Sequence, residues 1–560
     1  MSKGGVQSGF TLDGGSFHFS PTLALNPEHI ELEIQLDIPN HGFLGHCTTT
    51  IRSQSENSEL TRTIQFNAES FYSILNVSSS PIGIKSYSYS GHSLEINFNE
   101  SIPNSDQEFI SIQYIIFNPI SGLSFSSSTS NQTPNFVVSD HETERARYWI
   151  PCIDHPSVRT TYSVEISVPS EYTALACGKL ISSTPTTPKQ FEIPTFPSTL
   201  VSNTEFQQIS TKISQFKLNS SQILTQYLPE FTQKSVPNTD ESFSSTKTEN
   251  ESKENEQWTC WRWELEEICP SYLFCIAVGD FVKAELKRAS TRNDMELEVF
   301  APKLWYDANT LHCSFDSTGE MVDWMFKKLG RKLPWNKYFQ VATGSGIGGA
   351  MENISLVTWD DSLLVNESMR LERGWIMDSV NVHEMAHSYF GNAVVMKGFA
   401  HAWLKESWAS FMEVVYAEEH SHEMADSYGI LWMKREGYFT ESNAKYKRPM
   451  CCYKFDSSWD MFDRHLYPGG AWRLNMLRHY LGENVFWKAV QKYLDQYWNE
   501  TADTHDFQRV LEKHSNVSLE MFFNQWFYSP GHLKIKVQME YNVIEKSIGI
   551  QMEQIQMKES

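Results

Sequence analysis

The sequence predicts a multidomain protein with an antiparallel β domain first, a mainly helical α/β domain second, and a short β segment last. Its 560 residues are too many for one compact core, so several units are expected. Short runs in which apolar and polar residues alternate fill the first part of the chain, whereas helical periodicity fills the second part. The last residues return to the alternating pattern.

The N-terminal β domain is assigned to residues 1–284. From about residue 10 to 180, alternating runs such as 30–36 and 162–168 are separated by Pro, Gly, Asn and Ser. Alternation of this kind is typical of strands that bury one face. The pattern resumes at residue 258 and continues to about residue 283, which extends the same domain.

An insertion interrupts this domain at residues 183–257. No Gly, Ala, Cys, Trp or Arg occurs there, and Ser, Thr, Glu, Asn, Gln and Lys dominate. Because such a composition offers little apolar surface to bury, the sequence predicts a disordered, low-complexity loop.

The second domain is assigned to residues 285–529, and residues 530–560 begin a third. Helical periodicity dominates the second domain, with strand-like runs around a glycine cluster near 338–358. Two further strand-like runs follow at 533–539 and 548–552. About thirty residues can form a hairpin or two but no sandwich with its own core. We therefore expect a truncated β domain, or one that rests on a partner subunit.

Composition narrows the classes of partner. The formal net charge of −22 argues against nucleic acid, because phosphate binding requires clustered Lys and Arg. The N-terminus lacks the apolar stretch of a secretory signal, and no window reaches the roughly eighteen apolar residues of a membrane span. We therefore expect a cytoplasmic protein without a membrane partner, whose nine cysteines stay reduced.

A zinc site is predicted by the segment 383–387, which reads HEMAH, together with Glu406. Residues four apart lie on one face of a helix, so His383 and His387 can bind one ion while Glu384 projects toward its water as a general base. A catalytic zinc needs a third protein ligand and an open position. Glu406, nineteen positions after the second histidine, can supply that ligand. The five-residue pattern by itself also occurs in ordinary amphipathic helices.

Glu413 returns to the helical face of Glu406 seven residues later. A carboxylate there can orient a histidine ligand through a hydrogen bond. A glutamate at this spacing also occurs as a solvated or salt-bridged side chain, and both interpretations stay open. One zinc ion per chain is the expected cofactor.

Several separated motifs together resemble the M1 family of zinc aminopeptidases, gluzincins that combine an HExxH-x18-E metal site with a Gly-Ala-Met-Glu-Asn motif. The second motif occupies residues 349–353 here. Residues 148–156 resemble the family's β-domain signature, and residues 523–531 resemble the end of its catalytic domain. The resemblance therefore covers nearly the whole chain.

The resemblance implies an N-terminal β saddle, a thermolysin-like catalytic domain, a small β-sandwich and often a helical C-terminal domain. For this chain we expect only the start of the sandwich and no helical C-terminal domain.

The resemblance also implies roles for individual residues. Glu352 would hold the free α-ammonium of the substrate, and Glu142 would be the second carboxylate that binds it. Tyr467 would stabilise the oxyanion that forms when water attacks the scissile carbonyl. The other motif residues implied in binding the substrate's N-terminus are Gly349, Ala350, Met351 and Asn353.

Several positions depart from the family pattern, among them Ser407 in place of a glycine and Val395 in place of a common threonine. Lys405 replaces an asparagine beside the third ligand, Gly469 replaces a lysine in the tyrosine motif, and Asp140 replaces a glutamine. Because a lysine on a helix usually points to solvent, we expect Lys405 on the surface, although an inward orientation would tune metal affinity. Neither the change at Lys405 nor the change at Gly469 removes a ligand or a catalytic group. We therefore expect altered kinetics or specificity rather than inactivity.

The sequence thus predicts an aminopeptidase that removes single residues from peptides with a free N-terminus. The alternative is a non-catalytic scaffold that resembles the aminopeptidase-like subunit of a general transcription factor complex. A third interpretation is a bifunctional leukotriene hydrolase, suggested by segments 156–158 and 528–531. Residue preference, physiological substrate and oligomeric state stay open.

Overall fold

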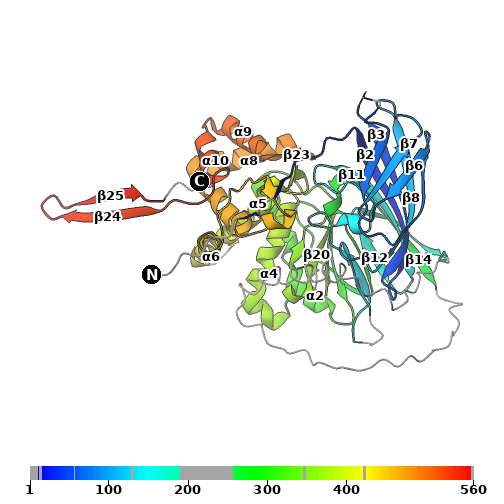
Figure 1. Cartoon of the computed structure of the whole chain (residues 1–560). Helices are drawn as coiled ribbons and strands as arrows, with labels where there is room; N and C mark the ends of the chain where they lie inside the picture. The colour runs from blue at the N-terminus through cyan, green and yellow to red at the C-terminus, as the bar shows by residue number, and fades with distance from the viewer. Residues whose placement is uncertain are drawn as a thin grey trace, which may run out of the picture.

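The structure is a computed structural model that describes residues 10–11, 15–55, 57, 59–127, 132–189, 257–344, 348–420 and 424–556. Figure 1 shows a β-rich N-terminal part beside a helix-rich part. Most of the predicted insertion, residues 190–256, lies outside the described residues, so its disorder stays a prediction. Its first residues belong to strand β13, Lys179–Thr186.

Seven strands form the largest sheet of the β-rich part, in the order β13-β14-β11-β2-β3-β8-β5. Its neighbouring strands run antiparallel, as predicted, except that β2 and β11 pair in parallel. Burial alternates along β3, so one face of the sheet packs on the core. The other strands of this sheet are β2 (Leu25–Asp37), β3 (Gly42–Ser53), β5 (Ser73–Ser80), β8 (Gln107–Phe117), β11 (Arg159–Pro169) and β14 (Trp258–Pro270).

Two smaller sheets complete this part, with the strand orders β12-β15-β10-β9 and β4-β7-β6. Strand β10 is buried along its whole length and ends at Ser139, so it carries the chain directly to Glu142. The strands are β4 (Thr63–Asn67), β6 (Ile84–Tyr89), β7 (Ser93–Phe98), β9 (Leu123–Ser126), β10 (Phe136–Ser139), β12 (Thr173–Ala176) and β15 (Ile276–Gly279).

A five-stranded mixed sheet opens the helix-rich part, in the order β16-β17-β18-β20-β19. Strands β17, β18 and β20 are parallel, and the last two are buried throughout, as expected for strands covered on both faces. The sheet begins at Phe281, just before the predicted boundary at residue 285. The strands are β16 (Phe281–Glu285), β17 (Glu296–Pro302), β18 (Lys337–Thr343), β19 (Ala350–Met351) and β20 (Leu356–Asp360).

Helix α5 occupies the centre of the helix-rich part, where it packs against α4, α6 and α7. Its buried residues cover most of its circumference, which is typical of a helix inside a core. The helices are α2 (Ala308–Phe315), α3 (Thr318–Leu329), α4 (Glu367–His387), α5 (Trp403–His420), α6 (Met424–Ala444), α7 (Gly470–Leu481), α8 (Glu483–Tyr497), α9 (Thr504–Ser515) and α10 (Glu520–Trp526). None of these described helices is both long and apolar enough to cross a bilayer.

Three two-stranded pairs complete the described structure. Strand β21 (Val394–Met396) pairs in parallel with β23 (Glu500–Ala502), and β1 (Ser16–Phe17) pairs with β22 (Lys454–Phe455). The predicted C-terminal strands form a hairpin of β24 (Ile535–Asn542) and β25 (Ser547–Gln554). This hairpin projects from the helix-rich part in Figure 1, and every residue of both strands is exposed.

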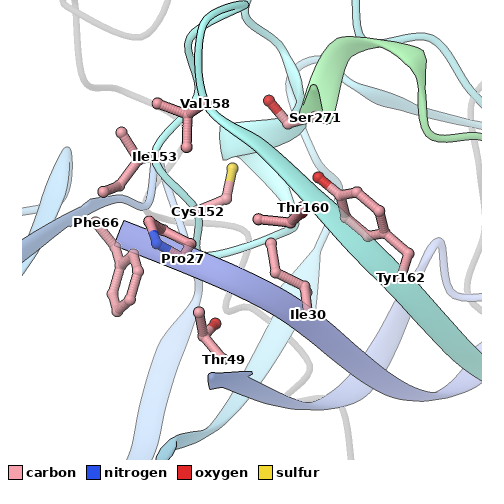
Figure 2. Close-up of a pocket in the computed structure, with 10 residues that line it drawn as sticks. All are labelled: Pro27, Ile30, Thr49, Phe66, Cys152, Ile153, Val158, Thr160, Tyr162 and Ser271. Atoms are coloured by element: carbon pink, nitrogen blue, oxygen red, sulfur yellow. The ribbon is translucent and has the colours of Figure 1, made fainter. Parts of the chain in front are cut away.

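The core of the β-rich part contains a cavity of about 10 Å³, shown in Figure 2. Its lining is mostly apolar and includes Ile30, Cys152 and Tyr162. A space of this size holds about one water molecule. It therefore offers no room for a peptide, and the candidate site lies elsewhere.

Candidate metal centre and active site

Helices α4 and α5 bring the three predicted metal ligands together. Helix α4 begins after Asn366, whose side chain accepts a hydrogen bond from the Met369 amide at 2.9 Å. At the other end of α4, His383 and His387 lie one turn apart, with ring centroids separated by 4.8 Å. Glu406 lies in the first turn of α5.

The geometry of these three side chains fits a tetrahedral zinc ion. The Glu406 Oε2 atom lies 3.3 Å from His383 Nε2 and 3.4 Å from His387 Nε2. Ligand atoms about 2.0–2.1 Å from a tetrahedral ion are about 3.3 Å apart. The observed separations therefore match those of a shared ion.

The second nitrogen of each imidazole is already occupied. His387 Nδ1 donates to the Phe390 carbonyl at 3.1 Å, which can only accept, so its proton lies on Nδ1. His383 Nδ1 lies 2.8 Å from the carboxylate of Glu413, which also accepts. Both Nε2 atoms therefore face Glu406 and are the nitrogens that could ligate a metal ion once they carry no proton.

Glu413 contacts one ligand and is held by two other side chains. Besides His383, its carboxylate accepts from Ser379 Oγ at 2.9 Å and from Lys434 Nζ at 2.9 and 3.0 Å. Burial would raise the pKa of Glu413, but Lys434 and His383 lower it to about 2. The carboxylate is therefore charged, and it fixes the orientation of the His383 ring.

The site strongly attracts positive charge. Glu406 is 2% exposed, and although burial would raise its pKa, Lys405 and His387 hold it well below the usual range. Burial likewise would lower the pKa of His383, but the hydrogen bonds that its ring donates to Glu406 and Glu413 raise it to about 10. A cation placed between the two histidines and Glu406 is therefore stabilised.

Glu384 has the properties of a general base. It is 5% exposed, and its Oε2 atom has no hydrogen-bond partner among the described residues. Burial is the main cause that raises the pKa of Glu384 to about 7, although the neighbouring histidines lower it. A carboxylate with a pKa near neutrality can both accept and return a proton. The orphaned buried oxygen marks the place where a water or substrate would bind.

Tyr467 lies in a short π-helical turn, His465–Gly469, next to the metal ligands. Its ring centroid is 6.1 Å from that of His383. Burial, followed by the charges of Glu406 and Glu142, raises the pKa of Tyr467 well above its usual value. The phenol therefore keeps its proton and can donate a hydrogen bond.

The turn that carries Tyr467 is attached to α5 by Ser407. Its Oγ donates to the Leu466 carbonyl at 2.7 Å. A Cβ atom at Gly470 would lie 1.8 Å from that Oγ, so only glycine fits there. Ser407 and Gly470 together let the turn approach the ligand helix closely.

The motif 349–353 lies at the edge of the five-stranded sheet. Gly349 has a φ of +128°, which favours glycine, and Ala350 and Met351 form the edge strand β19. Asn353 donates from Nδ2 to Thr358 Oγ1 at 3.2 Å, so its side chain holds the turn. The turn directs the buried Glu352 side chain to within 3.9 Å of His387 Nδ1.

Glu142 reaches the same place from the β-rich part. It is 6% exposed, and one carboxylate oxygen each from Glu142, Glu352 and Glu406 lies within 4.8 Å of the others. Nearby Asp140, which replaces the family's glutamine, forms an ion pair with Arg145 at 2.7 Å. The two predicted amine-binding glutamates therefore lie together beside the metal ligands.

The expectation that Lys405 points to solvent is wrong. Its side chain is fully buried, and Nζ lies 2.6 Å from Glu142 Oε1, 2.7 Å from Glu352 Oε1 and 2.5 Å from Glu406 Oε1. Three carboxylates packed in a dry core need a compensating positive charge. Burial would lower the pKa of Lys405, but these three carboxylates hold it well above the usual range.

Comparison with known families agrees with this geometry. The Peptidase M1 N-terminal domain model matches residues 26–204, and the Peptidase family M1 domain model matches residues 313–526. The chain belongs to peptidase family M1. Members of this family are metallopeptidases, generally with zinc.

Curated relatives of this M1 chain are aminopeptidases. It is 29% identical to "Aminopeptidase 2, mitochondrial" of Saccharomyces cerevisiae over 47% of this chain and 28% of the relative. It is 25% identical to the puromycin-sensitive aminopeptidase of Caenorhabditis elegans over 73% of this chain and 36% of the relative. It is also 25% identical to bovine (Bos taurus) glutamyl aminopeptidase, over 74% and 36% respectively. The chain therefore matches about a third of the length of these relatives.

Proposed function

We propose that this M1 chain is a zinc-dependent aminopeptidase, which hydrolyses the first peptide bond of peptides with a free N-terminus. The observation that carries the proposal is the matched geometry at His383, His387 and Glu406, next to the unpaired carboxylate oxygen of Glu384. In the family's terms, the β-rich part corresponds to the saddle domain, and the helix-rich part corresponds to the thermolysin-like domain.

The two histidines and Glu406 would hold one Zn²⁺ ion, with Glu413 fixing the His383 ring. When bound, such an ion lowers the pKa of its water and polarises the scissile carbonyl. Glu384 then accepts the proton of the attacking water and returns it to the leaving amine. Its burial supports this role, because a pKa of about 7 lets one carboxyl group perform both transfers.

The remaining residues stabilise the charge that develops during the reaction and determine which peptide bond is cleaved. The Tyr467 phenol, which stays protonated, donates a hydrogen bond to the developing oxyanion. Glu352 and Glu142 recognise the substrate's α-ammonium, so cleavage falls on the first bond. Peptides are the expected partners, and a cytoplasmic location stays a prediction.

The scaffold alternative receives no support from the site or the comparisons. All three candidate ligands and the base are present, and the relatives reported above are named aminopeptidases. Nothing in the described residues favours leukotriene hydrolysis.

The test is zinc content measured together with hydrolysis of a panel of aminoacyl-arylamides, each with and without an N-acetyl group. We expect one zinc per chain and turnover that Glu384→Gln abolishes while zinc is retained. Glu372→Gln, the same change on the exposed face of α4, is the matched control and should leave turnover unchanged. Stoichiometric zinc without any turnover would reject the proposal in favour of the scaffold.

A further inference from the structure

We propose that the Lys405 side chain is a built-in occupant of the amine-binding site: its ammonium takes the position that the proposed function assigns to the substrate's α-ammonium. This inference rests on the proposed function, which assigns these carboxylates to binding the substrate's α-ammonium. The position of the ammonium among three carboxylates is a property of the fold itself.

The chemistry of the two cations is the same. A peptide's α-ammonium is a compact positive charge with three N–H donors, and so is the end of a lysine side chain. Lys405 Nζ contacts one oxygen from each of Glu142, Glu352 and Glu406, at 2.5 to 2.7 Å. The contacts with Glu352 and Glu406 are hydrogen bonds and the contact with Glu142 is an ion pair, so the carboxylates that would recognise a substrate amine already face a cation.

The lysine is held firmly in this position. Its backbone lies in the first turn of α5, directly before the ligand Glu406, so no loop has to move to bring the ammonium there. The side chain is fully buried, with the rings of Tyr272 and Phe462 5.8 and 5.3 Å from Nζ. A buried cation in contact with three carboxylates is costly to withdraw.

Two ammonium groups cannot share this site. A substrate amine would have to displace Lys405 or bind beside a like charge, and either route lowers its affinity. The occupant therefore weakens selection for a free N-terminus in this chain. The two carboxylate oxygens of Glu406 contact different groups: Oε1 contacts Lys405, and Oε2 lies near the two histidines.

The proposal is tested by binding rather than by turnover. Leucinol carries the α-ammonium of leucine without a scissile bond, and N-acetylleucinol is its uncharged counterpart. The dissociation constants of both are measured by saturation-transfer NMR on the zinc-supplemented full chain. For the wild type we expect no more than about a threefold preference for leucinol, which is under 1 kcal/mol. A preference of about tenfold or more in the wild type would overturn the proposal.

The decisive variant is Lys405→Asn, which introduces the residue usual in the family. Hydrogen bonds to charged groups are worth about 10- to 100-fold in affinity, so the variant should bind leucinol tighter by that factor and N-acetylleucinol equally. Lys327→Asn, the same change at an exposed position on α3, should behave as the wild type. If the Lys405→Asn variant folds and its affinity for leucinol does not rise, the proposal is contradicted. If the variant does not fold, the preference of the wild type for leucinol decides.

Turnover of the arylamides, measured in parallel, separates this inference from the proposed function. A gain in leucinol binding without turnover in any variant would keep the occupied site and reject the aminopeptidase. Turnover by a wild type that strongly prefers leucinol would keep the aminopeptidase and reject the occupied site.

Discussion

Glu413 accepts a hydrogen bond from His383 Nδ1 at 2.8 Å and so connects the middle of α5 to the metal face of α4. Removing the charge of Glu413 weakens this acceptor and the control of the His383 ring. Partners of this kind typically contribute 10- to 100-fold to metal affinity. We therefore expect Glu413→Gln to lower zinc affinity by about that factor, measured by competition with a chromophoric chelator.

The matched control for this prediction is Ser379→Ala. It removes another hydrogen bond to Glu413 and leaves the contact with His383 intact. Its zinc affinity should stay within a few-fold of the wild type. Equal losses in both variants would show that Glu413 acts on general packing rather than on the ligand.

Glu384→Gln tests the general base separately from the metal site. The amide keeps the shape of the side chain but cannot accept a proton from water. We expect zinc content to stay at one per chain and kcat to fall at least about 10²–10⁴-fold, the usual contribution of a general base. Metal analysis and arylamide kinetics measure the two effects, and wild-type rates in the variant would refute the mechanism.

Tyr467→Phe removes a single donor next to the metal ligands. Loss of one oxyanion donor costs about 10²–10³-fold in kcat, and we expect a loss of that size with little change in KM. Tyr480→Phe, at a side chain that is 61% exposed on α7, is the control for loss of a phenol. A rise in KM with an unchanged kcat would instead place Tyr467 in substrate binding.

Lys337 is a buried lysine whose protonation should oppose folding. It is 7% exposed, and its Nζ donates to the Ala176 carbonyl at 2.6 Å. Burial lowers the pKa of Lys337 to about 7, whereas an unfolded lysine has a pKa of about 10.4. Between these values the unfolded chain binds more protons than the folded chain. The stability that depends on Lys337 therefore rises with pH across this window and is lowest below about pH 7.

Lys337→Met makes this dependence measurable. The variant has no proton to bind, so its stability relative to the wild type should be greatest below about pH 7 and should decline toward pH 10. The difference in unfolding free energy between variant and wild type should change by on the order of 5 kcal/mol across this window. The lost hydrogen bond lowers the stability of the variant by about 1 kcal/mol at every pH. Urea unfolding at several pH values, with the exposed Lys327→Met as control, measures it. A difference independent of pH would refute the assignment.

Local spacing was sufficient to predict that the candidate metal ligands and the candidate base would lie together. His383, Glu384 and His387 belong to one helix, whose geometry places side chains four residues apart on one face. The strands of the β-rich part followed from alternation, and the C-terminal hairpin formed where two alternating runs were recognised. The parallel pairing of β2 with β11 was not predictable in this way, because alternation reports the buried face of a strand and not its partner.

By itself, the sequence predicted which residues would be candidate metal ligands, which carboxyl would be the candidate base, and that β-rich and helix-rich parts follow one another. Only the tertiary structure decided what surrounds them. Lysine is a residue type usual at the surface, so the sequence predicted an exposed Lys405. Nothing near it in the sequence indicates that Glu142 and Glu352, which follow strands of two different sheets, contact it. The physical reason is that helical and strand periodicity are local properties. The charge balance of a buried site depends instead on groups that are distant in sequence.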